Sequence, residues 1–91
     1  VYALRIPAGT SLALHRHPRA MHMLVHQGLI VVALGADSAS ARVHRLGPGA
    51  RLTVPAGVWH REWWERDAVS EHGGRGPVEI EWAPGAGPPT T

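Results

Sequence analysis

The hydrophobic positions of this chain fall into short runs that end at glycine or proline, and none has the spacing of a long amphipathic helix. Runs that alternate or are continuously apolar are typical of strands, which we predict over residues 1–6, 11–17, 21–27, 29–34, 41–46, 51–54, 60–65, 68–72 and 78–82. Many short strands separated by turn residues indicate an all-β sandwich or barrel.

The connections between these strands are predicted from glycine and proline. Gly28 is expected to form a tight turn between 21–27 and 29–34, and the glycine-rich segment 73–76 to join 68–72 and 78–82 in a last hairpin. Residues 84–91 contain too few apolar side chains to offset the entropy lost on ordering. We therefore predict a β-barrel domain over 1–83 and a flexible tail over 84–91.

Alternation within 11–17 gives this strand two different faces. His15 and His17 share one face with Ala13, while Leu12 and Leu14 are expected on the other. Two adjacent imidazoles are half of a metal site. The opposite apolar face has to be covered by a second sheet layer or by another subunit.

Two more segments can supply imidazoles to the same place. His22 follows a turn at Pro18, and a strand returning from that turn would place it beside His15 and His17. The segment 49–60, GARLTVPAGVWH, contains a sharp proline and glycine turn that would aim His60.

Composition narrows the chemistry. The chain has no cysteine, which excludes disulfides and thiolate ligands and leaves histidine and carboxylates as strong metal ligands. All nine basic residues are arginine, scattered without a run, and a formal charge of +2 is too small to indicate nucleic-acid binding. No stretch approaches the roughly 18 consecutive apolar residues of a membrane span, and the N-terminal residues lack a signal-peptide pattern. We expect a cytoplasmic location.

These spacings resemble those of the cupin superfamily, whose first motif is G-x5-H-x-H-x3,4-E-x6-G and whose second is G-x5-P-x-G-x2-H-x3-N. The first motif is matched by Gly9, His15, His17 and Gly28, and the second by Gly49, Pro55, Gly57 and His60. Together the two motifs cover residues 9–64.

Two positions depart from the motifs. His22 occupies the slot of the first motif's glutamate, with a gap to Gly28 that is one residue short, so that Met21 is an alternative occupant of the slot. Trp64 replaces the asparagine of the second motif.

The resemblance implies a cupin-like antiparallel β-barrel, also called a double-stranded β-helix or jelly roll, that dimerises through its outer strand faces. It also implies one divalent metal in the interior, for which we predict the ligands His15, His17, His60 and His22. For His22, a position at the rim, near the metal but not on it, is the alternative. Four neutral imidazoles suit Fe(II), our first expectation, and also Zn, Cu, Ni or Mn.

Two residues beyond His60 are candidates for the chemistry. Glu62 and Trp64 share the face of His60 by alternation. Glu62 is expected to act as a general base or to hydrogen-bond a ligand imidazole, with a rim carboxylate paired to a nearby arginine as the alternative. Trp64 is expected to wall the substrate pocket.

The remaining histidines and two other tryptophans are not expected to bind the metal. His26 is expected near the barrel mouth as a second substrate contact, and His44 and His72 on the surface. Trp59 and Trp82 are expected to supply packing volume.

The sequence favours a metal-dependent enzyme acting on a small organic molecule, with dioxygenase chemistry as the leading expectation. Metal-dependent isomerisation, cyclisation or lyase chemistry remains open. So does a different class of function, a cupin module that binds a metal or small ligand without catalysis, or a barrel that recognises a sugar or acid with no metal.

Overall fold

The computed structural model describes residues 2–37, 39–74 and 79–85. Its strands are β1 (Tyr2–Ile6), β2 (Ser11–Arg16), β3 (Met21–Leu34), β4 (Arg42–Leu46), β5 (Arg51–Val54), β6 (His60–Gly73) and β7 (Glu81–Trp82). Every strand pairing is antiparallel. The predicted all-β class is confirmed, and the described residues contain no helix that could cross a membrane.

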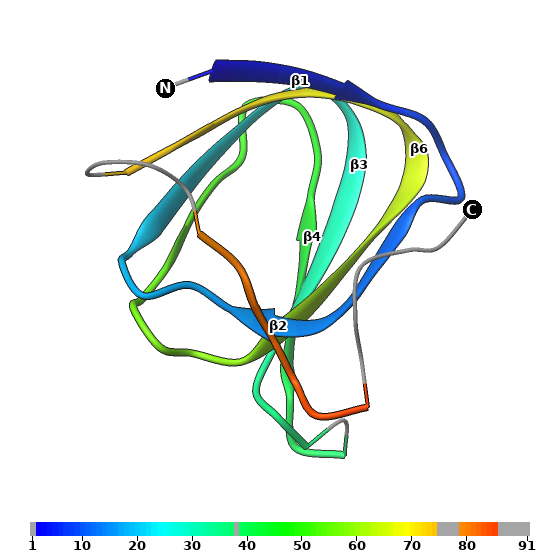
Figure 1. Ribbon diagram of the computed structural model, residues 1–91. Helices are drawn as coiled ribbons and strands as arrows, with labels where there is room; N and C mark the ends of the chain where they lie inside the picture. The colour runs from blue at the N-terminus through cyan, green and yellow to red at the C-terminus, as the bar shows by residue number, and fades with distance from the viewer. Residues whose placement is uncertain (1, 38, 75–78, 86–91) are drawn as a thin grey trace.

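Two long strands, β3 and β6, form the centre of the sheet. They pair with each other from His22 opposite Gly73 to Leu34 opposite His60. On its other edge β3 pairs first with β5 and then with β4, while β6 pairs first with β2 and then with β1. Each long strand therefore takes part in two sheet halves, which curve around a common interior (Figure 1).

The bend between the two halves lies at Gly28, and the predicted tight turn there is wrong. β3 continues through Gly28, which has φ of 91°, and its register with β6 shifts on both sides of this residue. A Cβ atom at Gly28 would collide with the carbonyl oxygen of Asp67 and with Ala68. Register shifts of this kind bend a strand and increase its twist, so the sheet can close on itself.

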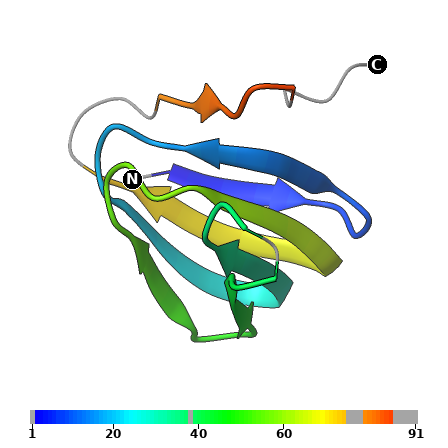
Figure 2. The same cartoon turned by 90° about the horizontal axis from the view of Figure 1, so that it is seen from below.

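The predicted last hairpin is also wrong. Residues 68–72 belong to the single strand β6, whose two edges are already occupied here by β1 and β3. β7 pairs instead with β2, with His15 opposite Trp82 (Figure 2). Half of the predicted turn, the first residue of the predicted strand and most of the predicted tail lie outside the described residues.

The core fills the space between the sheet halves. Its buried side chains are Met21, Met23, Val25, Ile30, Val32, Leu46, Val54, Trp64 and Ala68. Val31 and Ala33 are buried on the opposite face of β3, so this apolar run is covered on both sides.

Leu12 does not lie on the outer face of β2 as predicted. It packs partly against the core, because the register with β6 shifts between Leu12 and His15 and resets the alternation. Ala13 is correspondingly exposed. The homodimer expected from this face stays a prediction.

Candidate metal centre

Three buried histidines meet where the beginning of β6 lies beside the end of β2. His15 is the residue opposite His60 in the β2–β6 pairing, and His17 follows directly after β2. One ligand nitrogen from each of the three lies within 4.8 Å of the others, and their exposed fractions are 0%, 7% and 2% for His15, His17 and His60. The proline and glycine turn before β6 is docked there by a hydrogen bond from the Gly57 amide to the His17 carbonyl (2.8 Å).

Each of the three imidazoles is oriented by a backbone carbonyl. The Nδ1–H groups donate to the oxygens of Ala13 from His15 (2.7 Å), of Glu79 from His17 (2.7 Å) and of Val58 from His60 (3.0 Å). A ring whose Nδ1 carries the proton keeps a lone pair on Nε2 when it is neutral. Nε2 of His15 is buried without a hydrogen-bond partner. This arrangement fits a metal cation, because metal-binding histidines usually donate their other ring N–H in this way.

The surroundings of these rings shift the pKa values of His60 and His15 in opposite directions. It lowers the pKa of His60, and the neighbouring His15 and His17 lower it further against the effect of the Val58 carbonyl. Burial also opposes protonation of His15, but the nearby Glu62 carboxylate and the Ala13 carbonyl outweigh it and raise the pKa. A neutral His60 is ready to bind a metal, whereas His15 has a carboxylate beside it.

Glu62 and Trp64 lie on the same buried face of β6 as His60, as the alternation predicts. Glu62 is 7% exposed, and its Oε1 lies 3.5 Å from Nε2 of His15. The Nε1–H group of Trp64, a residue 2% exposed, is buried without a hydrogen-bond partner.

The structure does not bring His22 beside the three histidines. Met21 and Met23 point into the core with exposed fractions of 7% and 4%, so the alternation of β3 turns His22 outward. There its Nδ1 lies 3.0 Å from Oγ1 of Thr53. The interior position at this end of β3 is taken by Met21, whose thioether is a soft ligand.

His26 is also on the outer face. Its Nε2 lies 2.6 Å from Oε2 of Glu71, in an ion pair whose side chains are 46% and 38% exposed. This outward placement does not agree with the predicted role of His26 as a substrate contact near the barrel mouth.

His72 was expected on the surface, and that prediction is wrong. It is 7% exposed, and its Nε2 shares a 2.8 Å hydrogen bond with Oγ of Ser70. Burial lowers the pKa of His72; Glu62 acts in the opposite direction and His17 adds to the lowering. The signal was present in the sequence: apart from the exposed Arg66, even-numbered positions of β6 are on the inner face from His60 to His72, on both sides of the point where two strands were predicted.

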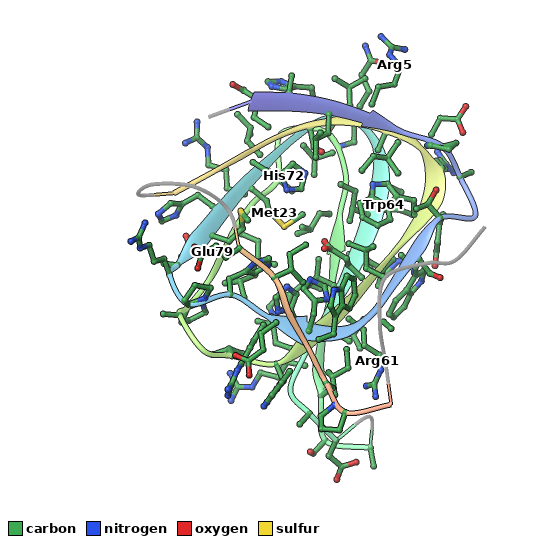
Figure 3. All side chains as sticks on the ribbon, viewed as in Figure 1. Arg5, Met23, Arg61, Trp64, His72 and Glu79 are labelled. Atoms are coloured by element: carbon green, nitrogen blue, oxygen red, sulfur yellow. The ribbon has the colours of Figure 1, made fainter. Side chains whose placement is uncertain are left out.

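These side chains surround a small interior cavity of about 110 Å³ that contains the three histidines, Glu62 and His72. Its apolar walls are Leu4, Ile6, Leu12, Met21, Met23, Trp64 and Ile80. Figure 3 shows Met23, His72 and Trp64 directed into the interior, whereas Arg5 and Arg61 point away from it.

The segment 79–83 covers the cluster on the side of β2. Its Glu79 carbonyl holds His17, and the Trp82 ring lies 5.2 Å from the His15 ring. The segment is fixed by a two-pronged ion pair between Arg16 and Glu81, with both N–O distances at 2.9 Å. Trp82 therefore packs, as expected, and does so directly against His15, a candidate metal ligand.

Comparison with known proteins gives matches in structure but not in sequence. No family model matches the chain, and no curated protein matches it. A cupin superfamily protein from Desulfitobacterium hafniense has a TM-score of 0.66 at 18% identity, over 77% of this chain and 60% of that one. Oxalate decarboxylase from Bacillus subtilis has a TM-score of 0.67 at 21% identity, over 77% of this chain and 19% of that one.

A third similar structure is salicylate 1,2-dioxygenase from Pseudoaminobacter salicylatoxidans, with a TM-score of 0.65 at 20% identity, over 77% of this chain and 18% of that one. The chain thus spans 60% or less of the length of these solved chains. At such identities the likeness concerns the fold.

Proposed function

We propose that this chain, which has the cupin fold, is a metal-dependent enzyme acting on a small organic molecule in its barrel interior, with dioxygenase chemistry as the leading reaction. The supporting observation is the convergence of three carbonyl-anchored imidazoles on one small, largely apolar cavity. That the substrate is a small molecule, that the protein is a homodimer and that it is cytoplasmic stay predictions from the sequence.

The donor set supports a divalent transition metal. His15, His17 and His60 offer three imidazole nitrogens, which suit Fe(II), Zn, Cu, Ni or Mn. Three histidines do not fill the coordination of such an ion, which leaves room for a substrate or water. When bound, the ion would supply Lewis-acid or oxygen-activating chemistry.

The side chains around the cavity limit the substrate. Its volume of about 110 Å³ lies below the roughly 300 Å³ at which pockets hold drug-sized ligands. Among the described residues, no arginine lines it, so a dianion would find no fixed positive side chain there. Trp64 offers an unpaired N–H to a substrate oxygen, and the aliphatic walls exclude water. We infer a small, mainly apolar substrate with an oxygen acceptor.

The names of two similar structures agree with such chemistry, since one is a dioxygenase and another a decarboxylase. These names describe those proteins. For this chain they favour oxidative or lyase reactions at a metal, and the reaction itself is decided by experiment.

Elemental analysis of the purified, untagged protein, followed by spectra with and without O2, tests the proposal. About one equivalent of iron whose absorption changes with O2, together with O2 uptake in a screen of small ketones, enols and carboxylic acids, would support a dioxygenase. Stoichiometric zinc without any response to O2 would overturn the dioxygenase assignment in favour of isomerase, cyclase or lyase chemistry. Metal without turnover of any compound would favour a binding module.

The Trp64→Phe variant sharpens this test. It keeps the aromatic wall but removes the N–H donor, so we expect a raised KM for the oxygen-bearing substrate with metal content unchanged. An unchanged KM would show that Trp64 acts only as packing.

A further inference from the structure

Glu62 is an unusual residue for a small apolar cavity. Among the described residues it is the only carboxylate lining the interior, and it is 7% exposed. A buried carboxylate is costly unless a cation or several hydrogen-bond donors compensate it. The ion-pair partner at hand is the imidazole of His15, which is itself fully buried.

The contact between these two groups is not a good hydrogen bond. Their distance of 3.5 Å exceeds the roughly 2.7–3.2 Å range of such bonds. Because Nδ1 of His15 donates to Ala13, a neutral His15 turns the lone pair of Nε2 toward a carboxylate oxygen. Two electron-rich atoms facing each other in a buried site require a positive charge between them, either a proton or a metal ion.

One metal ion bound between the two groups would produce a similar distance. Two ligand atoms at about 2.1 Å from an ion, separated by an angle of about 90–110°, lie about 3.0–3.4 Å apart. Glu62 also has the right position in the fold: it follows His60 by two residues on β6, as His17, directly after β2, follows His15. His15 and His60 are directly opposite each other. Adjacent strands thus present an H-x-H and an H-x-E pair to one point.

From this geometry we propose that Glu62 is the fourth protein ligand of the metal, supplied by β6 in place of the residue expected at the start of β3. That start contributes no carboxylate, because His22 faces outward and Met21 faces inward. Glu62 then lowers the net charge of the loaded site by one unit. A carboxylate also moves the preference of the site toward Fe(II) or Mn(II) relative to softer ions.

The inference rests on the metal binding of the proposed function, and titration of the metal-free protein with Co(II) separates the two. We expect Glu62→Gln to weaken Co(II) binding about tenfold or more and to alter the visible absorption of the bound ion. Glu71→Gln is the matched control, since Glu71 lies on the same strand with its side chain 38% exposed, and it should bind Co(II) like the wild type.

Glu62→Asp provides a second variant that keeps the charge. We expect it to bind Co(II) more tightly than Glu62→Gln but with a spectrum different from the wild type, because the carboxylate is withdrawn by one methylene. Circular dichroism establishes that each variant is folded.

Identical affinity and spectrum in the wild type and Glu62→Gln would overturn Glu62 as a ligand, while loss of binding in His60→Ala would still uphold the three-histidine site. Absence of Co(II) binding in the folded wild type would overturn both.

Discussion

The inner histidines, at the end of β2 and the start of β6, differ from the outer histidines of β3 in burial, orientation and contacts. His15 and His60 are buried and donate Nδ1–H to the backbone carbonyls of Ala13 and Val58, with Nε2 turned into the cavity. His22 and His26 are exposed and contact the side chains of neighbouring strands. Because an imidazole binds a metal only where its lone pair is oriented and other ligands converge on it, the comparison assigns metal chemistry to one group alone.

The largest expected effect separates these groups directly. His60→Ala should weaken metal binding by more than about 100-fold, because removing even an indirect supporting partner of a metal site costs 10–100-fold. His22→Ala should bind metal as tightly as the wild type, since its ring lies outside the cluster. Metal titration of both folded, metal-free proteins measures the difference, and a strong loss in His22→Ala would contradict the inward and outward assignment.

The next effect concerns the bend that sets which side chains face inward. Gly28→Ala should destabilise the fold by about 2–4 kcal/mol, since it combines a positive φ with a collision against the backbone of β6. Gly9→Ala is the matched control: its φ of 86° is similar, but nothing lies within 4 Å of the added Cβ. The free energies of unfolding in urea should therefore differ between the two variants. Equal losses of stability would mean that β6 does not lie close against Gly28.

A smaller effect comes from protonation of buried rings. The folded-state pKa of His72 is lowered by burial, so the unfolded state binds protons more readily and stability falls as pH drops below the unfolded value of about 6.5. His60 acts in the same direction and His15, whose pKa is raised, in the opposite one. We expect the metal-free His72→Gln protein to lose less stability than the wild type between pH 7 and pH 5 in urea unfolding. If stability changed with pH equally in both proteins, folding would not lower the pKa of His72.

The smallest effect belongs to the outer group. His26→Ala removes an exposed ion pair with Glu71 and should change stability by no more than about 0.5 kcal/mol. Metal content should also stay at the wild-type level. A thermal melt and elemental analysis of the purified variant check both statements, and a loss of metal would contradict the placement of His26 outside the site.

Much of the candidate site could be predicted from local patterns. The spacing of His15, His17 and His60 within glycine-bounded motifs identified the residues that the structure brings together. The alternation after His60 also placed Glu62 and Trp64 on its face. These predictions succeeded because each depends on a period of two within one uninterrupted strand or on a short turn.

Two of the errors share one cause, which is that alternation specifies two faces but not which of them is buried. Leu12 and Ala13 exchanged sides because the register shifts within β2, and His22 faces outward because the flanking methionines fill the core. His72 was missed because β6 was read as two strands.

The sequence by itself determined an all-β chain with three histidines at suitable spacings for one site. Only the tertiary structure decided that Gly28 is a bend rather than a turn, that His22 lies outside, and that His72 joins the cavity. The physical reason is that these outcomes depend on contacts between strands far apart in the chain, such as the approach of Gly28 to Asp67, whereas periodicity reports only on neighbours along one strand.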